Sequence, residues 1–135
     1  MATLFEKLNL KGRQEIAVLH APASFEPELA RLPVLTLHHH LQSVAEISFL
    51  LAFVTRKAEV EALAAEVAAR AKGDAVVWFA YPKGTSKKLQ CDFNRDTGWD
   101  ALNALGFETV RAVAIDEDWT ALRFRRREFI KARAK

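Results

Sequence analysis

The chain has 135 residues and a mass of 15.2 kDa, which is the size of one compact domain. Half of its residues are hydrophobic and 27% are charged, a composition that excludes a disordered or low-complexity protein. The single cysteine, Cys91, excludes an internal disulfide framework and any zinc site built on several cysteines.

The net charge of +3 is unevenly distributed. Residues 119–135 hold seven basic residues against one acid, a local net charge of +6, which leaves −3 for residues 1–118. A mildly acidic body with one basic end argues against a protein whose whole surface binds nucleic acid. No apolar run reaches the roughly 20 residues of a membrane-spanning helix, and the first residues lack a signal-peptide pattern. We therefore expect a cytoplasmic protein with no membrane partner.

The first half of the chain alternates helical patterns with short apolar runs. Because these runs are continuous rather than alternating, they predict strands that are buried on both faces. In chain order we expect a helix or turn, a strand, a helix, two strands and a long helix at residues 3–8, 15–20, 24–30, 33–38, 48–54 and 56–72. Ser24 and Thr55 are the expected caps of the second and third helices, and Gly73 is the expected stop.

The second half of the chain ends in two consecutive strand-like segments. We expect a fourth buried strand, a polar loop, a helix and these two strands at residues 75–80, 81–88, 96–105, 108–115 and 119–126. Gly106 closes the helix. The last two segments are joined by three acids, a connection so short that it predicts an antiparallel hairpin. The remainder, 127–135, is expected to be a short helix or a frayed basic tail.

Strands that alternate with helices predict a mostly parallel sheet covered on both faces. We therefore expect a single α/β domain over residues 1–135, with three layers, a doubly wound sheet and a C-terminal antiparallel hairpin. This order resembles the core of class I S-adenosylmethionine-dependent methyltransferases, whose Rossmann-like sheet also ends in an antiparallel hairpin. The resemblance covers most of the chain as topology.

The cofactor turn of that fold follows the first strand and carries glycines. Residues 18–25 of this chain contain no glycine, and Pro22 lacks an N–H where the backbone would have to approach a cofactor. The resemblance implies that the second strand should end in an acid for ribose hydroxyls, but in this chain Leu37 is followed by three histidines. The sequence therefore predicts a trimmed methyltransferase-like fold with a degenerate cofactor site, and it assigns no cofactor.

Three segments resemble the signature of a small bacterial family of short stand-alone proteins of unknown function. They are Tyr81-Pro-Lys83, residues 92–100 and residues 113–124. This resemblance implies a methyltransferase-like fold and no particular activity.

The polar loop after the fourth expected strand is the first candidate binding site. Its side chains suit an anion such as phosphate or carboxylate; they are Lys83, Thr85, Ser86 and Lys87. The loop follows a parallel strand, and open α/β sheets bind ligands at the carboxyl edge. A solvated basic loop fits the same residues and is favoured, because the spacing of a phosphate loop is missing.

A dense polar segment follows this loop. It holds the side chains of an acid–base or hydrogen-bonding site: Asp92, Asn94, Arg95 and, as an apolar wall, Trp99. A structural interpretation is at least as good. In that case Asp96 or Thr97 begins the next helix, Arg95 pairs with a carboxylate and Trp99 packs on the sheet.

The second expected strand ends in three histidines, of which His38 and His40 would share one face. These two are weak metal candidates, because a stable zinc or nickel site needs three or four ligands. His20 ends the first strand and would lie near this cluster if the two strands are neighbours. A polar strand end that is rich in histidine is the favoured interpretation, so we expect no metal site.

The basic end of the chain alternates arginine with apolar residues. Arg123, Arg125 and Arg127 would face one side of the last strand, and the other side would carry Leu122, Phe124 and Arg126. Because cations keep an edge strand from pairing with another sheet, edge protection is the favoured interpretation. Contact with nucleic acid is the less favoured one.

We therefore expect a non-catalytic binding module. It would use the carboxyl edge of the sheet for a small anion or a protein partner, through His20, Lys83, Asp92, Asn94 and Arg95. The alternatives are a methyltransferase-like enzyme with an atypical cofactor loop and a nucleic-acid contact through the basic C-terminal strand and tail. Exposed strand edges and the apolar stripe of the long helix are compatible with a homodimer.

Overall fold

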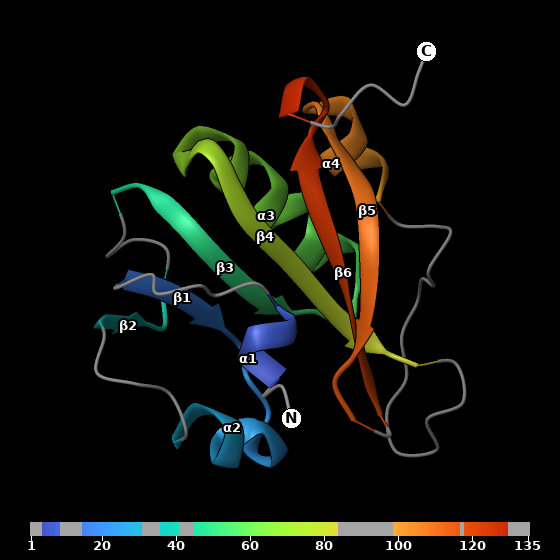
Figure 1. The fold of residues 1–135 in the computed structure, drawn as a ribbon. Coiled ribbons are helices and arrows are strands. Elements are labelled where there is room, and N and C mark those ends of the chain that lie inside the picture. The colour runs from blue at the N-terminus through green and yellow to red at the C-terminus, as the bar shows by residue number, and fades with distance from the viewer. Residues whose placement is uncertain are drawn as a thin grey trace.

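The computed structural model describes residues 4–8, 15–30, 36–40, 45–83, 99–116 and 118–129. In this part of the chain, six strands form one mixed sheet with the order β2-β1-β3-β4-β6-β5 (Figure 1). The strands are β1 (Glu15–Leu19), β2 (Thr36–His38), β3 (Ile47–Phe53), β4 (Ala71–Pro82), β5 (Phe107–Ala114) and β6 (Trp119–Arg126). Strands β1 to β4 are parallel, and β6 runs antiparallel to both β4 and β5. The predicted, mostly parallel sheet with a C-terminal hairpin is confirmed.

Helices cover both faces of this sheet. They are α1 (Leu4–Lys7), the 3-10 turn η1 (Ala23–Phe25), α2 (Glu26–Ala30), α3 (Lys57–Arg70), α4 (Asp100–Ala104) and the 3-10 turn η3 (Arg127–Phe129). In Figure 1, α1 and α2 lie in front of the sheet, and α3 and α4 lie behind it. Each face therefore has its own apolar cluster, as the predicted three-layer architecture requires. None of the described helices is long and apolar enough to cross a membrane.

Strands β3 and β4 lie in the middle of the sheet because their apolar side chains serve both faces. In β3, Phe49 and Leu51 point into the buried cluster on the face that carries α1, which we call the α1 cluster. Leu50 points into the buried cluster on the opposite face, under α3, which we call the α3 cluster. Burial of one such side chain stabilises the fold by about 1.5–3 kcal/mol. A continuous apolar run can obtain this energy on both faces only in the interior of the sheet.

The strand order reverses at β1. The chain places β2 on one side of β1 and then returns to place β3 on the other side. Ligands of open α/β sheets bind outside the carboxyl ends of the strands at such a reversal. The carboxyl ends of β1 and β2 are therefore the first place to look for a site.

Helix α3 is shorter than predicted at both ends. The residue at its cap position is Arg56, not Thr55, and the helix is capped by a carboxylate instead of a hydroxyl. Glu59 accepts hydrogen bonds from the backbone N–H groups of Thr55 at 2.7 Å and Arg56 at 3.1 Å. At the other end Ala71 is already extended and begins β4, so Gly73 does not stop the helix.

Of two other predicted helix ends, the start at Ser24 is wrong and the end at Gly106 is confirmed. The helix expected from Ser24 begins earlier, as the turn η1, in which the Phe25 N–H donates to the Pro22 carbonyl at 2.9 Å. Pro22 therefore holds the cap position that was predicted for Ser24. The prediction for Gly106 is confirmed, because this residue closes α4 with a φ of 97° that suits glycine.

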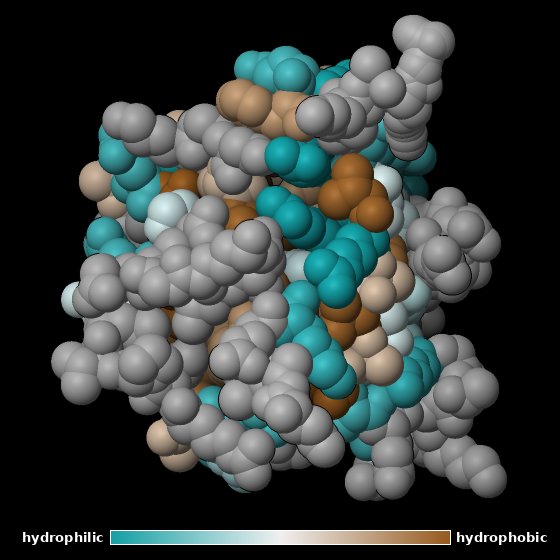
Figure 2. Space-filling model, in the orientation of Figure 1, coloured by the Kyte–Doolittle hydropathy of each residue, from teal (hydrophilic) through white to brown (hydrophobic). Residues whose placement is uncertain are grey.

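The position of β6 overturns the predicted role of its arginines. Because β6 lies between β4 and β5, it is an interior strand, and its arginines do not protect a sheet edge. Two consecutive arginines instead bind helix ends. Arg126 donates to the carbonyls of Ala68 and Ala71 at the end of α3, and Arg127 donates to the carbonyl of Asn103 in α4. Figure 2 shows the front face of the molecule, where hydrophilic side chains gather in a band over β6 and β5.

Candidate ligand-binding site

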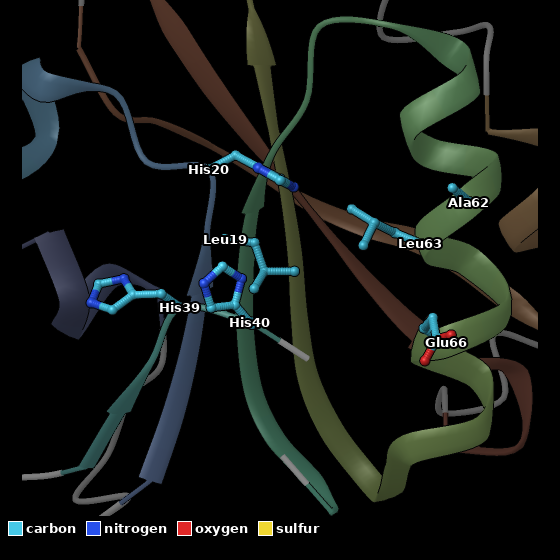
Figure 3. Close-up of a pocket in the computed structure, with 7 residues that line it drawn as sticks. All are labelled: Leu19, His20, His39, His40, Ala62, Leu63 and Glu66. Atoms are coloured by element: carbon cyan, nitrogen blue, oxygen red, sulfur yellow. The ribbon is translucent and has the colours of Figure 1, made fainter. Parts of the chain in front are cut away.

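A cavity of about 280 Å³ lies at the carboxyl ends of β1 and β2, with α3 as its opposite wall (Figure 3). It is lined by residues from three parts of the chain: Leu19, His20, His39, His40, Ala62, Leu63 and Glu66. Leu19 is the last residue of β1, and the two histidines His39 and His40 follow the last residue of β2. The cavity therefore lies at the strand-order reversal.

Parallel pairing brings the histidines of two separate strands to this edge. β1 and β2 are hydrogen-bonded neighbours in parallel, with Ala17 opposite His38, so both strands end on the same side. His20 was expected to lie near the other histidines if the first two strands are neighbours, and they are. In Figure 3 the imidazoles of His20 and His40 lie on the side of the cavity toward α3, whereas the ring of His39 points away from α3.

His20 has an uncommon backbone conformation. Its φ is 58°, and it is the only residue other than glycine with a positive φ in the described part of the chain. Glycine adopts this left-handed region freely, while a residue with a Cβ atom pays about 1–2 kcal/mol. The strained residue stands in the turn where the methyltransferase resemblance implies glycines. The structure thus keeps the tight turn after β1 and places an imidazole on it.

The α3 wall combines apolar and charged side chains. Leu63 and Glu66 face the cavity in Figure 3, and Leu63 also packs against the buried cluster behind it. The Glu66 carboxylate accepts a hydrogen bond from Nε of Arg70 at 3.0 Å. These wall residues were not among the site residues predicted from the sequence. A usable signal exists, because Leu63 and Glu66 are three residues apart and therefore lie on one side of the helix, beside its buried stripe.

The histidines after β2 are arranged differently from the predicted metal candidates. Strand β2 ends at His38, so His38 and His40 are not alternate residues of one strand as predicted. Nε2 of His38 instead pairs with the carboxylate of Glu15, 2.5 Å away. Among the residues that the structure describes, no group of three or more histidine, cysteine, aspartate or glutamate side chains could hold a metal ion.

The other predicted site residues lie elsewhere or outside the described residues. Lys83 follows β4 at the same edge of the sheet but two strands from β1, and its N–H donates to the carbonyl of Asp118 at 2.8 Å. Residues 84–98 lie outside the described residues, and with them six of the predicted site residues: Thr85, Ser86, Lys87, Asp92, Asn94 and Arg95.

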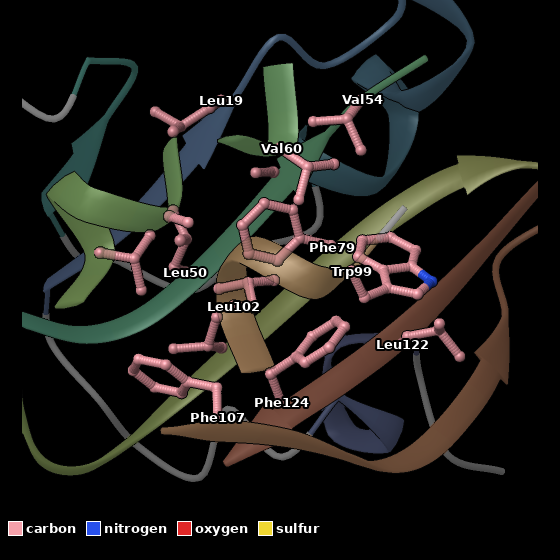
Figure 4. Close-up of a cluster of buried hydrophobic side chains, with 14 of the residues drawn as sticks. Leu19, Leu50, Val54, Val60, Phe79, Trp99, Leu102, Phe107, Leu122 and Phe124 are labelled. Atoms are coloured by element: carbon pink, nitrogen blue, oxygen red, sulfur yellow. The ribbon is translucent and has the colours of Figure 1, made fainter. Parts of the chain in front are cut away.

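Trp99 is a core residue in the structure, as its structural interpretation predicts (Figure 4). Its ring lies 6.1 Å from that of Phe79, 5.8 Å from that of Tyr81 and 5.1 Å from that of Phe124, measured between centroids. A side chain enclosed in this way stabilises α4 against the sheet and leaves little surface to serve as the wall of a ligand site.

The residues at this edge do not fit S-adenosylmethionine, the cofactor that the fold suggests. The turn after β1 carries side chains at His20, Ala21 and Ala23, and Pro22 has no N–H to offer a carboxylate. The cavity is also slightly below the range of about 300–1,000 Å³ that is usual for drug-sized ligands.

No protein-family model matches the sequence, and no curated protein matches it. Solved structures match the fold. The chain is similar to a SAM-dependent methyltransferase from Aquifex aeolicus, with 12% identity and a TM-score of 0.63 over 90% of this chain and 86% of that one. It is also similar to a putative type 11 methyltransferase from Sulfolobus solfataricus, with 9% identity and a TM-score of 0.56 over 87% and 88% of the two chains. The protein therefore has a methyltransferase-like Rossmann fold.

Proposed function

We propose that the protein is a non-catalytic binding module that holds a small anionic ligand in the cavity at the carboxyl ends of β1 and β2. The observation that carries this proposal is that His20 and His40, from two neighbouring strand ends, line one cavity together with Leu63 and Glu66 of α3. Lys83 and the predicted polar residues after β4 remain candidates for a second part of the site.

The lining suits a ligand with one anionic and one apolar part. An imidazole presents N–H donors to a phosphate or carboxylate oxygen, and Leu19 with Leu63 forms an apolar surface next to them. Glu66 adds an acceptor for a hydroxyl or amine of the ligand, and Arg70 balances its charge. The cavity volume favours a ligand smaller than a nucleoside cofactor.

Binding is favoured over covalent chemistry because of the side chains that line the cavity. Among the lining residues that the structure describes there is no serine, threonine, cysteine, lysine or tyrosine that would act as a nucleophile. Two imidazoles can still hold or move a proton, so the distinction between binding and catalysis needs an experiment.

The imidazole signals in a proton–carbon correlation spectrum test the proposal directly. The chain has four histidines, and His38, paired with Glu15 outside the cavity, is an internal control. Inorganic phosphate or acetate at millimolar concentration should shift the signals of His20 and His40 and leave that of His38 in place. If neither probe moves the His20 and His40 signals, or if all four histidines respond alike, the proposal is wrong.

The second candidate, a methyltransferase with an atypical cofactor loop, is supported by the fold alone. Thermal denaturation with S-adenosylmethionine and S-adenosylhomocysteine separates the two. A ligand at 100 times its Kd stabilises the folded state by about 2.7 kcal/mol. A stabilisation of this order with either compound, and none with phosphate or acetate, would replace the binding-module proposal with the enzyme.

A further inference from the structure

Two opposite walls of the cavity offer different hydrogen-bonding groups. The wall made by the strand ends carries His20 and His40, and the other wall is α3, where Glu66 faces the cavity (Figure 3). An imidazole offers an N–H donor, whereas an ionised carboxylate only accepts hydrogen bonds. A ligand that contacts both walls therefore needs an acceptor at one end and a donor at the other.

An apolar surface lies between these polar groups. Leu19 directly precedes His20, and Leu63 precedes Glu66 by three residues, on the same side of α3. With a rise of about 1.5 Å per residue, Leu63 and Glu66 are about 4.5 Å apart along the helix axis. A few methylene groups of a ligand can therefore lie over Leu63 before its donor reaches Glu66.

The carboxylate of Glu66 suits a cationic donor better than a neutral one. Its Oε1 accepts a hydrogen bond from Nε of Arg70 at 3.0 Å, and a carboxylate has sites for about four such bonds. The side chain is 51% exposed, so a ligand can reach it from solvent. Because a hydrogen bond between an ammonium group and a carboxylate is roughly twice as strong as a neutral one, an amine is a better partner here than a hydroxyl.

The net charge of the surrounding chain favours a ligand without a net charge. Residues 1–118, which include every described lining residue, carry a net charge of −3. This charge repels a simple anion, whereas a molecule that holds one positive and one negative group is not repelled.

We infer that the ligand of this cavity is a small ω-amino acid, with a carboxylate and an ammonium group at the two ends of a short methylene chain. The carboxylate lies against the imidazoles, the chain lies over Leu63, and the ammonium group bonds to Glu66. An α-amino acid carries both charges on one carbon atom and therefore brings them to the same wall. This inference rests on the proposed function, because its carboxylate is the anion proposed there to bind the histidines.

Titrations followed by the imidazole signals, at constant pH, compare matched probes on the full chain. γ-Aminobutyrate, δ-aminovalerate and ε-aminocaproate are each compared with the acid of the same length, which is butyrate, valerate or caproate. At least one ω-amino acid should bind about five-fold more tightly than its matched acid, the factor that an exposed ion pair of about 1 kcal/mol provides. Norvaline, the α-amino isomer of δ-aminovalerate, should bind no more tightly than valerate.

Three variants test the part played by Glu66. Glu66→Gln keeps the shape of the side chain and removes its charge, so the ω-amino acid and its matched acid should bind alike. Glu61→Gln changes an exposed acid of the same helix outside the described lining and should keep the five-fold preference. Arg70→Gln removes the ion-pair partner of Glu66 but not its carboxylate, so the preference should also remain.

The results separate this inference from the function on which it rests. If acetate and valerate move the His20 and His40 signals but no ω-amino acid binds better than its matched acid, the inference is wrong and the anion site stands. If none of the probes moves these signals, both are wrong. The inference also fails if norvaline binds as tightly as δ-aminovalerate, or if Glu61→Gln or Arg70→Gln abolishes the preference as fully as Glu66→Gln does.

Discussion

The guanidinium group of Arg126 lies over the ring of Phe107, with 4.8 Å between Cζ and the ring centroid. The same group donates from Nη2 to the carbonyls of Ala68 at 3.1 Å and Ala71 at 3.0 Å. One side chain of the last strand therefore satisfies two carbonyls at the end of α3 while it stacks on β5. Helix α3 and the C-terminal hairpin meet at this contact, although more than 50 residues separate them in the sequence.

We predict that Arg126→Ala lowers the free energy of unfolding by about 2–3 kcal/mol, because it removes two charge-assisted hydrogen bonds and the contact with the ring. Arg126→Lys should cost less, about 1–2 kcal/mol, since an ammonium group cannot bond to both carbonyls with a planar fork. Urea denaturation measures both values. Arg127→Ala is the control: it removes an exposed ion pair and an exposed hydrogen bond to the Asn103 carbonyl, with an expected loss of about 1 kcal/mol or less. Equal losses at residues 126 and 127 would contradict this account.

A second long-range contact holds α1 on the sheet. The indole N–H of Trp78 in β4 donates to the carbonyl of Leu8, directly after α1, at 2.8 Å, and both residues are fully buried. Trp78→Phe leaves that carbonyl without its donor and should lower the free energy of unfolding by about 2–4 kcal/mol. Amide exchange in α1 should accelerate more than exchange in β3, because α1 loses its attachment first.

Trp119→Phe is the matched control for this prediction. It removes the same atoms from a buried ring whose described contact is the edge-on packing against Phe53, 5.0 Å between centroids. We expect a smaller loss of stability and no selective exchange in α1. If the two variants behave alike, the hydrogen bond to Leu8 is not what holds α1.

The fold could be predicted because hydrophobic patterns are local. The continuous runs of β3 and β4 predict two-sided burial, and the short acidic connection before Trp119 predicts the hairpin. The order of the strands in the sheet could not be predicted in the same way, because it is not a local property of the sequence. Nothing in the spacing of the arginines in β6 distinguishes an edge strand from one between β4 and β5, and the prediction of edge protection was wrong for this reason.

The site could be predicted only in part, for a related reason. Its sequence signals, His20 and the histidines after β2, lie at strand ends, and the parallel order brings such ends together. The opposite wall comes from α3. In the sequence its Glu66 looks like any charged residue on the solvent-exposed face of a helix. Its position over the cavity depends on how α3 packs, which is a tertiary property. The left-handed backbone of His20 likewise has no signal in the residue type.

The start of α3 gives a third prediction. Glu59→Ala removes the carboxylate that accepts the N–H groups of Thr55 and Arg56, and it should lower the free energy of unfolding by about 1 kcal/mol. Glu59→Gln keeps an acceptor oxygen and should cost clearly less. Glu61→Ala, an exposed change on the same helix, is expected to stay within about 0.5 kcal/mol of the parent chain. Thermal denaturation of the four proteins would contradict the capping role if Glu59→Ala and Glu61→Ala coincide.

The strained turn at His20 separates stability from binding. His20→Gly should raise the free energy of unfolding by about 0.5–1 kcal/mol, because glycine relieves the left-handed strain but gives the unfolded chain more freedom. His20→Ala keeps the strain and loses the imidazole, so its stability should stay close to that of the parent chain. Both variants should lose phosphate and acetate binding in the cavity, which the signal of His40 reports. A variant that gains stability while it loses binding identifies strain that is kept for the site. If His20→Gly is less stable than His20→Ala, the left-handed backbone at residue 20 costs less than the added freedom of glycine in the unfolded chain, and the idea of strain kept for the site is wrong.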